Sequence, residues 1–507
     1  IMNFVVSNAQ MKQAERAAND SGTSYLELMK NAGNACFERI KKIVGEISGK
    51  RVVVLAGKGN NGGDGIVISQ LAADEGANAA LVFLKGLPVS DCARECYALY
   101  KNKDSAIIYG ENKGKVRELL ADGDVIVDCV FGTGFHGGLE PEIAELFSYI
   151  NSGCKGFKAS VDVPSGCNSD TGEIAENAFK PDVTLTLGAV KKGLFNHPCF
   201  DFCGHLVLLK IGIDSDCYNE YEAVLTDRKI LSYIPERAKS AHKGTYGRLL
   251  NISGSGCFMG AAALSTRAAL RVGTGIVTLA SVKEVIRTMG AAIPEATFLP
   301  LESDEDGFMD SDCTEQLGEM LPKATAVSVG CGMGNNAETR KIAEYVLKKA
   351  DCPIILDADG INSAAGNINV LKDNKAGLII TPHPAEFGRL TGLSAKAVQS
   401  DRISLAKSFA AEHNAVVALK GVNTVIASPD GKAFVNTTGN AGLAKGGSGD
   451  VLTGIIAGLT AQGVEPFSAA VLGVYLHGLA ADELAGRMSM AGILPSDVIE
   501  TLPFVMK

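Results

Sequence analysis

Short apolar runs alternate with longer amphipathic runs along most of the chain. In the first half the apolar runs lie at 51–56, 79–84, 124–130, 156–163, 182–187 and 205–210. They are rich in β-branched residues and lack a strict polar–apolar alternation, which is typical of strands buried on both faces. Helical stretches such as 65–76 and 141–150 lie between them. This order predicts βαβ units and therefore a mostly parallel sheet covered by helices on both sides.

A polar, weakly patterned stretch at 213–229 interrupts this alternation, which then starts again. The later apolar runs lie at 248–253, 275–280, 326–330, 353–357, 377–381 and 415–420, and a hairpin with an SPDG turn is expected at 424–436. The two halves share no repeat period, so a fusion of two different α/β domains is expected. We expect the first domain at 1–214, a linker at 215–226 and the second domain at 227–507.

The composition excludes several classes of protein. Hydrophobic residues make up 46% and charged residues 21% of the 507 positions, which excludes a disordered chain. A net charge of -9 and the absence of Trp argue against nucleic-acid binding. The chain contains no run of 18 apolar residues, so no membrane span is expected. The first ten residues do not resemble a secretory signal. The 13 cysteines include no CxxC pair, so we expect reduced thiols in a cytoplasmic protein.

Three glycine-rich segments of the first half follow predicted strands. Gly57-x-Gly59-x-x-Gly62 matches the dinucleotide fingerprint, but the next strand does not end in the acidic residue that would hold a ribose. An ordinary nicotinamide-dependent dehydrogenase is therefore disfavoured. The other two segments are 132–137 and 164–172. Because parallel strands all end at one edge, the three segments are expected to form one ligand crevice there.

Two aspartates, Asp128 and Asp162, lie at or near the ends of these strands and are expected to project into the crevice. Asn61, Asp128 and the hydroxyl of Ser165 offer oxygen ligands to a monovalent cation. The alternative is that the loops are tight turns and the aspartates cap helices.

The second half contains its most specific motif at 446–450. Gly446, Gly447, Ser448 and Gly449 precede Asp450 and an apolar helix. Amide groups at a helix start bind a phosphoryl group, and a neighbouring carboxylate takes a proton from a hydroxyl nucleophile. The motif therefore predicts a hydroxyl phosphotransferase, the alternative being a glycine-rich turn in which Asp450 caps the helix.

Further loops of the second half also follow predicted strands. They lie at 254–262, 330–336, 357–362, 381–390 and 420–424. Lys420, at the end of a strand, is a candidate phosphate contact. His383, between Pro382 and Pro384, is held rigidly, so it is a candidate substrate contact or else a surface turn residue.

Together these motifs resemble a known family along most of the chain. NNGGDG, DCVFGTGFHGG and VDVPSG resemble the NAD(P)H-hydrate epimerase domain, which implies a Rossmann-like α/β/α sandwich. HKGTYGRLLNISGS, GCGMG, LDADGIN, TPHPAEFGRL and GGSGDVLTG resemble the NAD(P)H-hydrate dehydratase domain, which implies a ribokinase-like α/β/α fold. The order of the two is similar to that in the bifunctional NAD(P)H-hydrate repair enzymes.

The resemblance implies a repair activity on damaged nicotinamide coenzymes. Hydration of NADH or NADPH at C6 gives R and S epimers, which the first domain interconverts. The second domain phosphorylates the C6 hydroxyl of the S epimer with ADP, and phosphate elimination then restores the coenzyme. ATP in place of ADP stays open. The resemblance also implies potassium in the first domain, Mg²⁺ with the nucleotide in the second, and a homo-oligomer.

Carried over residue by residue, the resemblance implies four sets of site residues. The catalytic residues are Asp162, for acid–base help, and Asp450, as the base on the hydroxyl. The potassium ligands are Asn61, Asp128 and Ser165. The substrate contacts are Asn60, Asn61, Gly62, Gly63, Asp64, Gly132, Thr133, Gly134, Phe135, His136, Gly137, Gly138, Asp162, Ala261, Gly334, His383 and Asp450. The nucleotide contacts are Lys420, Gly421, Val422, Asn423, Thr424, Asn440, Ala441, Gly442, Leu443, Ala444, Lys445, Gly446, Gly447, Ser448 and Gly449.

The sequence departs from the family pattern at two places, and two alternative functions stay open. Cys331 stands where many relatives have proline, and DADGIN replaces DADALN or similar. One alternative makes the first domain a non-catalytic module that binds a nucleotide-like ligand or a protein. The other makes the second domain an ordinary kinase for a vitamin or a sugar.

Overall fold

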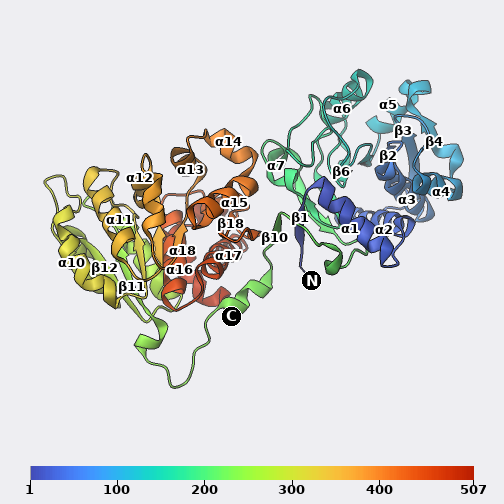
Figure 1. Ribbon diagram of the computed structural model, residues 1–507. Coiled ribbons are helices and arrows are strands. Elements are labelled where there is room, and N and C mark those ends of the chain that lie inside the picture. Colours follow the sequence, from blue (N-terminus) through green and yellow to red (C-terminus); the bar gives the residue numbers. More distant parts are fainter. Residues whose placement is uncertain (1) are drawn as a thin grey trace. The chain divides into compact units, whose positions relative to one another are not determined.

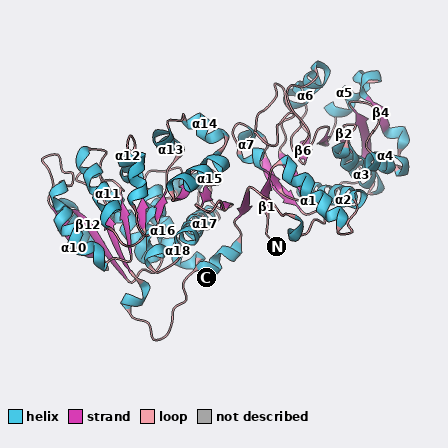
Figure 2. Cartoon of the chain, viewed as in Figure 1, coloured by secondary structure: helices cyan, strands magenta, loops and turns pink. Residues whose placement is uncertain are grey.

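The computed structural model describes residues 2–507, which divide into two compact units, 2–224 and 225–507. The chain passes from one unit to the other within the short strand β10 (Ala223–Leu225). This strand lies inside the segment that the sequence analysis assigns to the linker. Each unit has its own parallel sheet and its own helices (Figures 1 and 2).

The first unit is built on a seven-stranded sheet in the order β4-β3-β2-β5-β6-β7-β9. All neighbouring strands of this sheet run parallel. The strands are β2 (Arg51–Ala56), β3 (Asn78–Phe83), β4 (Ala106–Ile108), β5 (Val125–Cys129), β6 (Phe157–Val161), β7 (Val183–Leu187) and β9 (His205–Leu209). The chain moves outward from β2 to β4 and then returns to begin β5 beside β2. The topological switch point therefore lies between β2 and β5, where α/β sheets of this type bind ligands.

Helices cover both faces of this sheet, as the alternation of apolar runs predicts. They are α1 (Asn8–Asp20), α2 (Tyr25–Val44), α3 (Asn60–Asp74), α4 (Asp91–Leu99), α5 (Lys113–Ala121), α6 (Pro141–Gly153) and α7 (Cys199–Phe202). Residues of α1 to α4 share one hydrophobic cluster with one side of the strands. Residues of α5 and α6 share a second cluster with the other side.

The start of α3 corrects the sequence analysis, which places residues 57–64 in a loop. The helix begins at Asn60, so the NNGGD motif forms its first turns. A Cβ atom at Gly62 would lie 2.0 Å from the carbonyl oxygen of Gly57, and one at Gly63 would lie 2.4 Å from the sulfur of Met29. The glycines therefore allow close packing of the helix against β2 and α2, so the motif has a structural role beside any role in binding.

The second unit has a parallel core in the order β13-β12-β11-β14-β15-β16-β17, followed by the antiparallel strands β18 and β19. The strands are β11 (Arg248–Ile252), β12 (Ile276–Val282), β13 (Thr297–Leu301), β14 (Ala326–Val329), β15 (Ile354–Leu356), β16 (Leu378–Ile380), β17 (Val416–Leu419), β18 (Val425–Ala427) and β19 (Ala433–Val435). Here the switch point lies between β11 and β14.

The longest apolar helices pack together against one face of the second sheet. Residues of α8, α16, α17 and α18 form one large cluster with the strands. The helices of this unit are α8 (Met259–Arg271), α9 (Lys283–Ala292), α10 (Thr314–Met320), α11 (Ala337–Lys349), α12 (Ala358–Ala364), α13 (Pro384–Thr391), α14 (Ala395–Ser400), α15 (Arg402–His413), α16 (Ser448–Ala461), α17 (Pro466–Ala485) and α18 (Pro495–Val505). None of the helices within residues 2–507 combines the length and the hydropathy needed to span a bilayer.

The sequence analysis missed five short strands. Two of them, β4 and β13, are edge strands, and β13 carries Pro300, which an edge position tolerates. The other three are β1 (Phe4–Val6), β8 (Val190–Lys191) and β10, which pair with one another around β1. β8 positions Lys191 near the first site, so this omission bears on the chemistry.

Candidate active sites of the two units

A cavity of about 410 Å³ lies at the switch point of the first sheet. Of the predicted substrate contacts, these line it: Asn60, Asn61, Asp64, Gly132, Thr133, Gly134, Phe135 and Asp162. Gly62 and Gly63 are buried in α3, and His136 to Gly138 lie outside the cavity lining. The structure thus brings together most of the residues from two of the three glycine-rich segments.

Asp162 follows β6 and carries the most constrained carboxylate of this cavity. Its backbone is in the left-handed region, with φ of 69°, a conformation that costs a non-glycine residue about 1–3 kcal/mol. Its Oδ1 accepts a hydrogen bond from Lys191 Nζ in an ion pair. The Lys191 side chain is 1% exposed, and its Nζ also donates to the carbonyl of Leu187 at 2.8 Å. A buried cation therefore fixes this carboxylate.

Two further carboxyl groups share the cavity. Asp64, on α3, is 7% exposed, and burial raises its pKa well above the usual value, with the charges of Asp162 and Glu15 adding to the effect. Burial likewise raises the pKa of Glu15, on α1, against the charge of Lys191. The sequence analysis found Asp64 but missed Glu15 and Lys191. No local motif marks either residue, because only the folded chain brings α1 and β8 to the crevice.

Two of the three predicted potassium ligands, Asp128 and Ser165, are hydrogen-bonded to each other, and the third, Asn61, lines the cavity. Asp128 is 0% exposed, and its carboxylate accepts hydrogen bonds from the Ser165 hydroxyl at 2.6 Å, the Ser160 hydroxyl at 2.9 Å and the Ser165 amide at 2.8 Å. Burial nevertheless raises its pKa to about 6. Asp128 is thus enclosed and does not project into the open crevice, which corrects the expectation from sequence.

The side-chain amide of Asn61 has a buried oxygen atom without a hydrogen-bond partner. Its Nδ2 donates to the carbonyl oxygens of Phe131 at 3.0 Å and Val161 at 3.3 Å. Its Oδ1 is buried and has no hydrogen-bond partner. A buried acceptor without a donor is costly, and a cation would satisfy it. The oxygen-rich surroundings fit a hard monovalent ion.

In the second unit, Asp450 lies in the first turn of α16. Gly447 is the N-cap of this helix, with φ of 94° and no side-chain cap, so the first amides of the helix are not covered by a capping side chain. Burial raises the pKa of Asp450 to about 6, and the charge of Asp357 adds to the effect. Asp450 is thus an acid in the first turn and not the cap of the helix.

Asp357 and Lys420 form a buried ion pair beside Asp450. Lys420 Nζ lies 2.8 Å from Asp357 Oδ1 and 3.9 Å from Glu386 Oε2. The Asp357 carboxylate also accepts hydrogen bonds from the hydroxyls of Thr381 and Thr453, both at 2.8 Å. A Cβ atom at Gly449 would lie 3.4 Å from Lys420 Nζ, so the lysine abuts the glycine-rich helix start. The sequence analysis placed Lys420 here but did not name Asp357 as a site residue.

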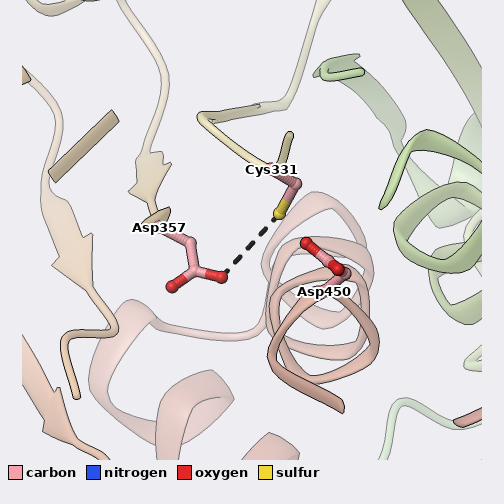
Figure 3. Close-up of side chains that lie close together, drawn as sticks. All are labelled: Cys331, Asp357 and Asp450. Carbon is pink, nitrogen blue, oxygen red and sulfur yellow. Dashed lines mark hydrogen bonds between the residues drawn. The ribbon is translucent and has the colours of Figure 1, made fainter. Parts of the chain in front are cut away.

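Cys331 faces both aspartates, as Figure 3 shows. One ligand atom each from Cys331, Asp357 and Asp450 lies within 4.8 Å of the others, and the thiol donates weakly to Asp357 at 3.8 Å. Burial keeps the pKa of Cys331 well above the usual value. A neutral thiol is a poor ligand for Mg²⁺, so these three groups alone do not make a magnesium site.

The remaining predicted nucleotide contacts fall into two groups. The Lys420–Thr424 loop exposes Val422, which is 62% exposed, and is held by a bond from Asn423 Nδ2 to the carbonyl of Asn436. Asn440 and Lys445 are engaged elsewhere. Asn440 binds Asp482, and Lys445 Nζ donates to the carbonyls of Ala491 and Ile493. These two side chains brace the loop between 439 and 447 rather than point to a free anion site.

Of the predicted substrate contacts in this unit, His383 is the N-cap of α13. Its Nδ1 accepts hydrogen bonds from the amides of Ala385 and Glu386, and Glu386 Oε2 accepts from the His383 amide at 2.8 Å. The imidazole is half exposed, so a cap and a substrate contact are compatible. Ala261 packs near Gly332, and the amide of Gly334 donates to Asp359.

Comparisons with known proteins agree with the two-unit description. A family model described as NAD(P)H-hydrate dehydratase matches residues 249–504, and one described as YjeF-related protein N-terminus matches residues 25–193. The chain is 35% identical to the bifunctional NAD(P)H-hydrate repair enzyme Nnr of Moorella thermoacetica, over 99% of this chain and 97% of that one. It is 34% identical to the enzyme of the same name from Escherichia coli, over 97% and 92%.

The chain is also similar to the solved structure of an ADP/ATP-dependent NAD(P)H-hydrate dehydratase from Bacillus subtilis, co-crystallised with ATP and Mg²⁺. The identity is 35%, the alignment covers 55% of this chain and 96% of that one, and the TM-score is 0.49.

Proposed function

The chain belongs to the family of bifunctional NAD(P)H-hydrate repair enzymes, and we propose that each unit carries out one of the two reactions at the site described above. The first unit interconverts the R and S epimers of hydrated NADH or NADPH. The second unit dehydrates the S epimer. The assignment of particular residues to these steps is our proposal.

The observation that carries the dehydratase proposal is the arrangement of Asp450, Lys420 and the start of α16. The uncapped amides and Lys420 give a positive surface for the terminal phosphoryl group of a nucleotide. Asp450 is an acid with a pKa of about 6, close to the range in which a general base is efficient at neutral pH. The three groups lie within reach of one transferring phosphoryl group.

In the proposed reaction Asp450 removes the proton of the C6 hydroxyl, and the oxygen of that hydroxyl attacks the terminal phosphorus of the nucleotide. The bond from that phosphorus to the bridging oxygen breaks, and AMP leaves if ADP is the donor. Loss of phosphate from C6 and of a proton from C5 then restores the double bond. Hydroxide is a poor leaving group, so phosphorylation gives a physical reason for a kinase-like fold in a dehydratase. Mg²⁺ would be held mainly by the nucleotide phosphates and water.

The epimerase proposal rests on Asp162 in the cavity of the first unit. C6 of the hydrate carries both a hydroxyl and the ring nitrogen, so inversion requires proton transfer to and from oxygen. Asp162 lines the cavity, is ion-paired with Lys191 and is placed by a strained backbone. We assign it acid–base help in this step, and we assign the predicted substrate contacts that line the same cavity to binding of the hydrate.

Potassium is proposed as a structural cation of the first unit, held by Asn61, Asp128 and Ser165. The buried, unpartnered Oδ1 of Asn61 and the raised pKa of Asp128 support this, because a cation offsets both. Replacing potassium by choline should slow epimerisation and leave dehydration of pure S epimer unchanged. Equal rates in both salts would contradict the assignment.

The test of the whole proposal is recovery of the dihydronicotinamide absorbance band. The full chain receives a mixture of hydrate epimers with ADP and Mg²⁺. We expect all of the mixture to return to NADH in two phases, a fast one from the S epimer and a slow one limited by epimerisation. A stable phosphorylated product without recovery of the band would contradict it.

We further propose a cytoplasmic location, supported by the thirteen free cysteines, and a homo-oligomer, which sedimentation would test.

A further inference from the structure

The cavity of the first unit contains carboxyl groups in contrasting electrostatic surroundings. Asp162 pairs with the buried ammonium of Lys191. Asp64 is as well buried as a core residue, and within residues 2–507 it forms no ion pair. When two carboxyl groups share a site and their surroundings favour opposite protonation states, they are candidates for the base and the acid of one reaction.

The two groups come from different elements that converge on the cavity. Asp64 lies in the first turns of α3, after β2, and Asp162 follows β6. Both line the same volume of about 410 Å³, which suits the reacting end of a dinucleotide. Lys191 comes from β8 and lines the cavity as well. The geometry therefore allows a ring in the cavity to meet both carboxyl groups.

We propose that Asp64 is the acid and Asp162 the base of epimerisation, and that Lys191 is a positioning residue that fixes these roles. This deepens the proposed epimerase function and rests on it. Burial raises the pKa of Asp64 well above its usual value, and the negative charge of Asp162 raises it further, so the surroundings of Asp64 favour its protonated form. Lys191 pairs with the side chain of Asp162 and fixes its orientation.

The proposed step balances with water as the co-reactant. Asp64 gives its proton to the C6 hydroxyl as the C6–O bond breaks, and the ring nitrogen lone pair forms a C=N bond. Water is released, and C6 becomes planar. A water molecule then attacks the opposite face and gives a proton to Asp162, while the electron pair returns to the ring nitrogen. Exchange with solvent resets both carboxyl groups, and epimerisation in the other direction follows the same route.

Other titratable groups surround this pair and must be considered in any pH experiment. Glu15 of α1 is a third carboxyl group with a raised pKa, so it is the main rival as the acid. The remaining groups that line the cavity or act on Asp64 or its neighbours are Lys12, Tyr25, Cys36, Lys58, Lys85, Cys92, Cys96 and Cys129. Burial raises the pKa of Cys36 and Cys129 well above the usual value, so they remain neutral thiols.

The experiment measures the slow phase of NADH recovery against pH in the full chain, with the fast phase as an internal control for folding and for the second unit. The wild-type slow phase should rise through an acidic limb and fall through an alkaline limb. Asp64→Asn should lower the slow rate about 100-fold or more and remove the alkaline limb. Glu15→Gln should leave that limb in place. Loss of the limb in Glu15→Gln but not in Asp64→Asn would overturn the assignment of the acid.

Lys191→Met tests the positioning role. Removing the ammonium leaves Asp162 near two other carboxyl groups, so the acidic limb should move to higher pH. Lys191→Gln gives the same test with a polar side chain if the methionine variant folds poorly. Lys155→Met removes an exposed positive charge from the same unit and should move neither limb. An unchanged acidic limb in both Lys191 variants would overturn the role.

An isotope experiment tests the route. In water enriched in oxygen-18, the wild-type enzyme without nucleotide should place the label in the C6 hydroxyl at the rate of epimerisation, and Asp162→Asn should slow both together. Epimerisation without uptake of label would overturn the proposed step. The proposed function fails separately, because then neither phase of NADH recovery appears in the wild-type chain.

Discussion

At the scale of single residues, the chemistry of each unit depends on one carboxylate held next to a buried lysine. Asp162 pairs with Lys191 in the first unit, and Asp357 pairs with Lys420 beside Asp450 in the second. A second acid lies near each pair, Asp64 in the first unit and Asp450 in the second, and burial raises the pKa of both.

The first prediction concerns Asp450→Asn. The amide cannot accept the proton of the C6 hydroxyl, so NADH recovery should fall by about 100-fold or more in both phases. Chromatography should still show interconversion of the two epimers, because that reaction belongs to the other unit. Asp373→Asn, an exposed position in the same unit, is the matched control and should retain activity. Dehydration at the wild-type rate by Asp450→Asn would refute its role as base.

The second prediction concerns pH. Asp450 acts as a base only when it is ionised, and its pKa is raised to about 6 by burial and by the charge of Asp357. The rate of dehydration of pure S epimer should therefore be constant above this value and fall about tenfold per pH unit below it. Stopped-flow absorbance between pH 4.5 and 8 would measure this at about ten values. A rate that stays constant down to pH 4.5 would contradict the raised pKa of Asp450.

At the scale of elements, the N-terminus of α15 supports the predicted nucleotide loop. Arg402, the first residue of this helix, is 1% exposed, and its Nη2 donates to the carbonyl of Val422 at 2.6 Å. Its Nε and Nη1 have no partner within the described residues, and burial lowers its pKa to about 10. Gly421 has φ of 154°, and a Cβ there would lie 2.5 Å from Nη1. The loop and the arginine therefore fit each other closely.

The third prediction is that Arg402→Met weakens nucleotide binding. Losing the bond to Val422 frees the loop, so the KM for ADP should rise about tenfold, the equivalent of about 1.4 kcal/mol. The maximal rate and the KM for the hydrate should change little. The melting temperature should stay the same or rise, because an apolar side chain replaces a buried charge with few hydrogen-bond partners. Arg402→Lys keeps the charge and should give a smaller change in KM. A lower melting temperature with an unchanged KM for ADP would indicate a role in folding alone.

At the scale of the whole molecule, each unit has its own parallel sheet, its own hydrophobic clusters and its own site. Neither site draws a described hydrogen bond or ion pair from the other unit. Two complete cores imply that the two reactions are separable, and that each unit folds without the other.

The fourth prediction follows from this separation. A chain that begins at residue 225 should recover NADH rapidly from the S epimer and then stop, leaving the R epimer to its slow spontaneous inversion. Adding a chain that ends at residue 224 should restore the slow phase. Complete recovery by the chain that begins at residue 225, without the other chain, would place the epimerase activity in the second unit and refute the division of labour.

The sequence by itself determined the alternation of elements, the glycine-rich segments and the place of Asp450. These depend on local patterns, because a strand buried on both faces and a helix start each have a signature within a few residues. The twelve apolar runs taken as strands correspond to strands in the structure. The family could be named because its motifs are also local.

Only the tertiary structure decided which charges meet. Lys191 lies 29 positions from Asp162, and Thr453 lies 96 positions from Asp357, so no window of sequence contains either pair. Lys191 belongs to a two-residue strand with no periodic pattern of its own. Burial and the nearest charge determine whether a carboxyl group holds its proton, and both are properties of the packed chain.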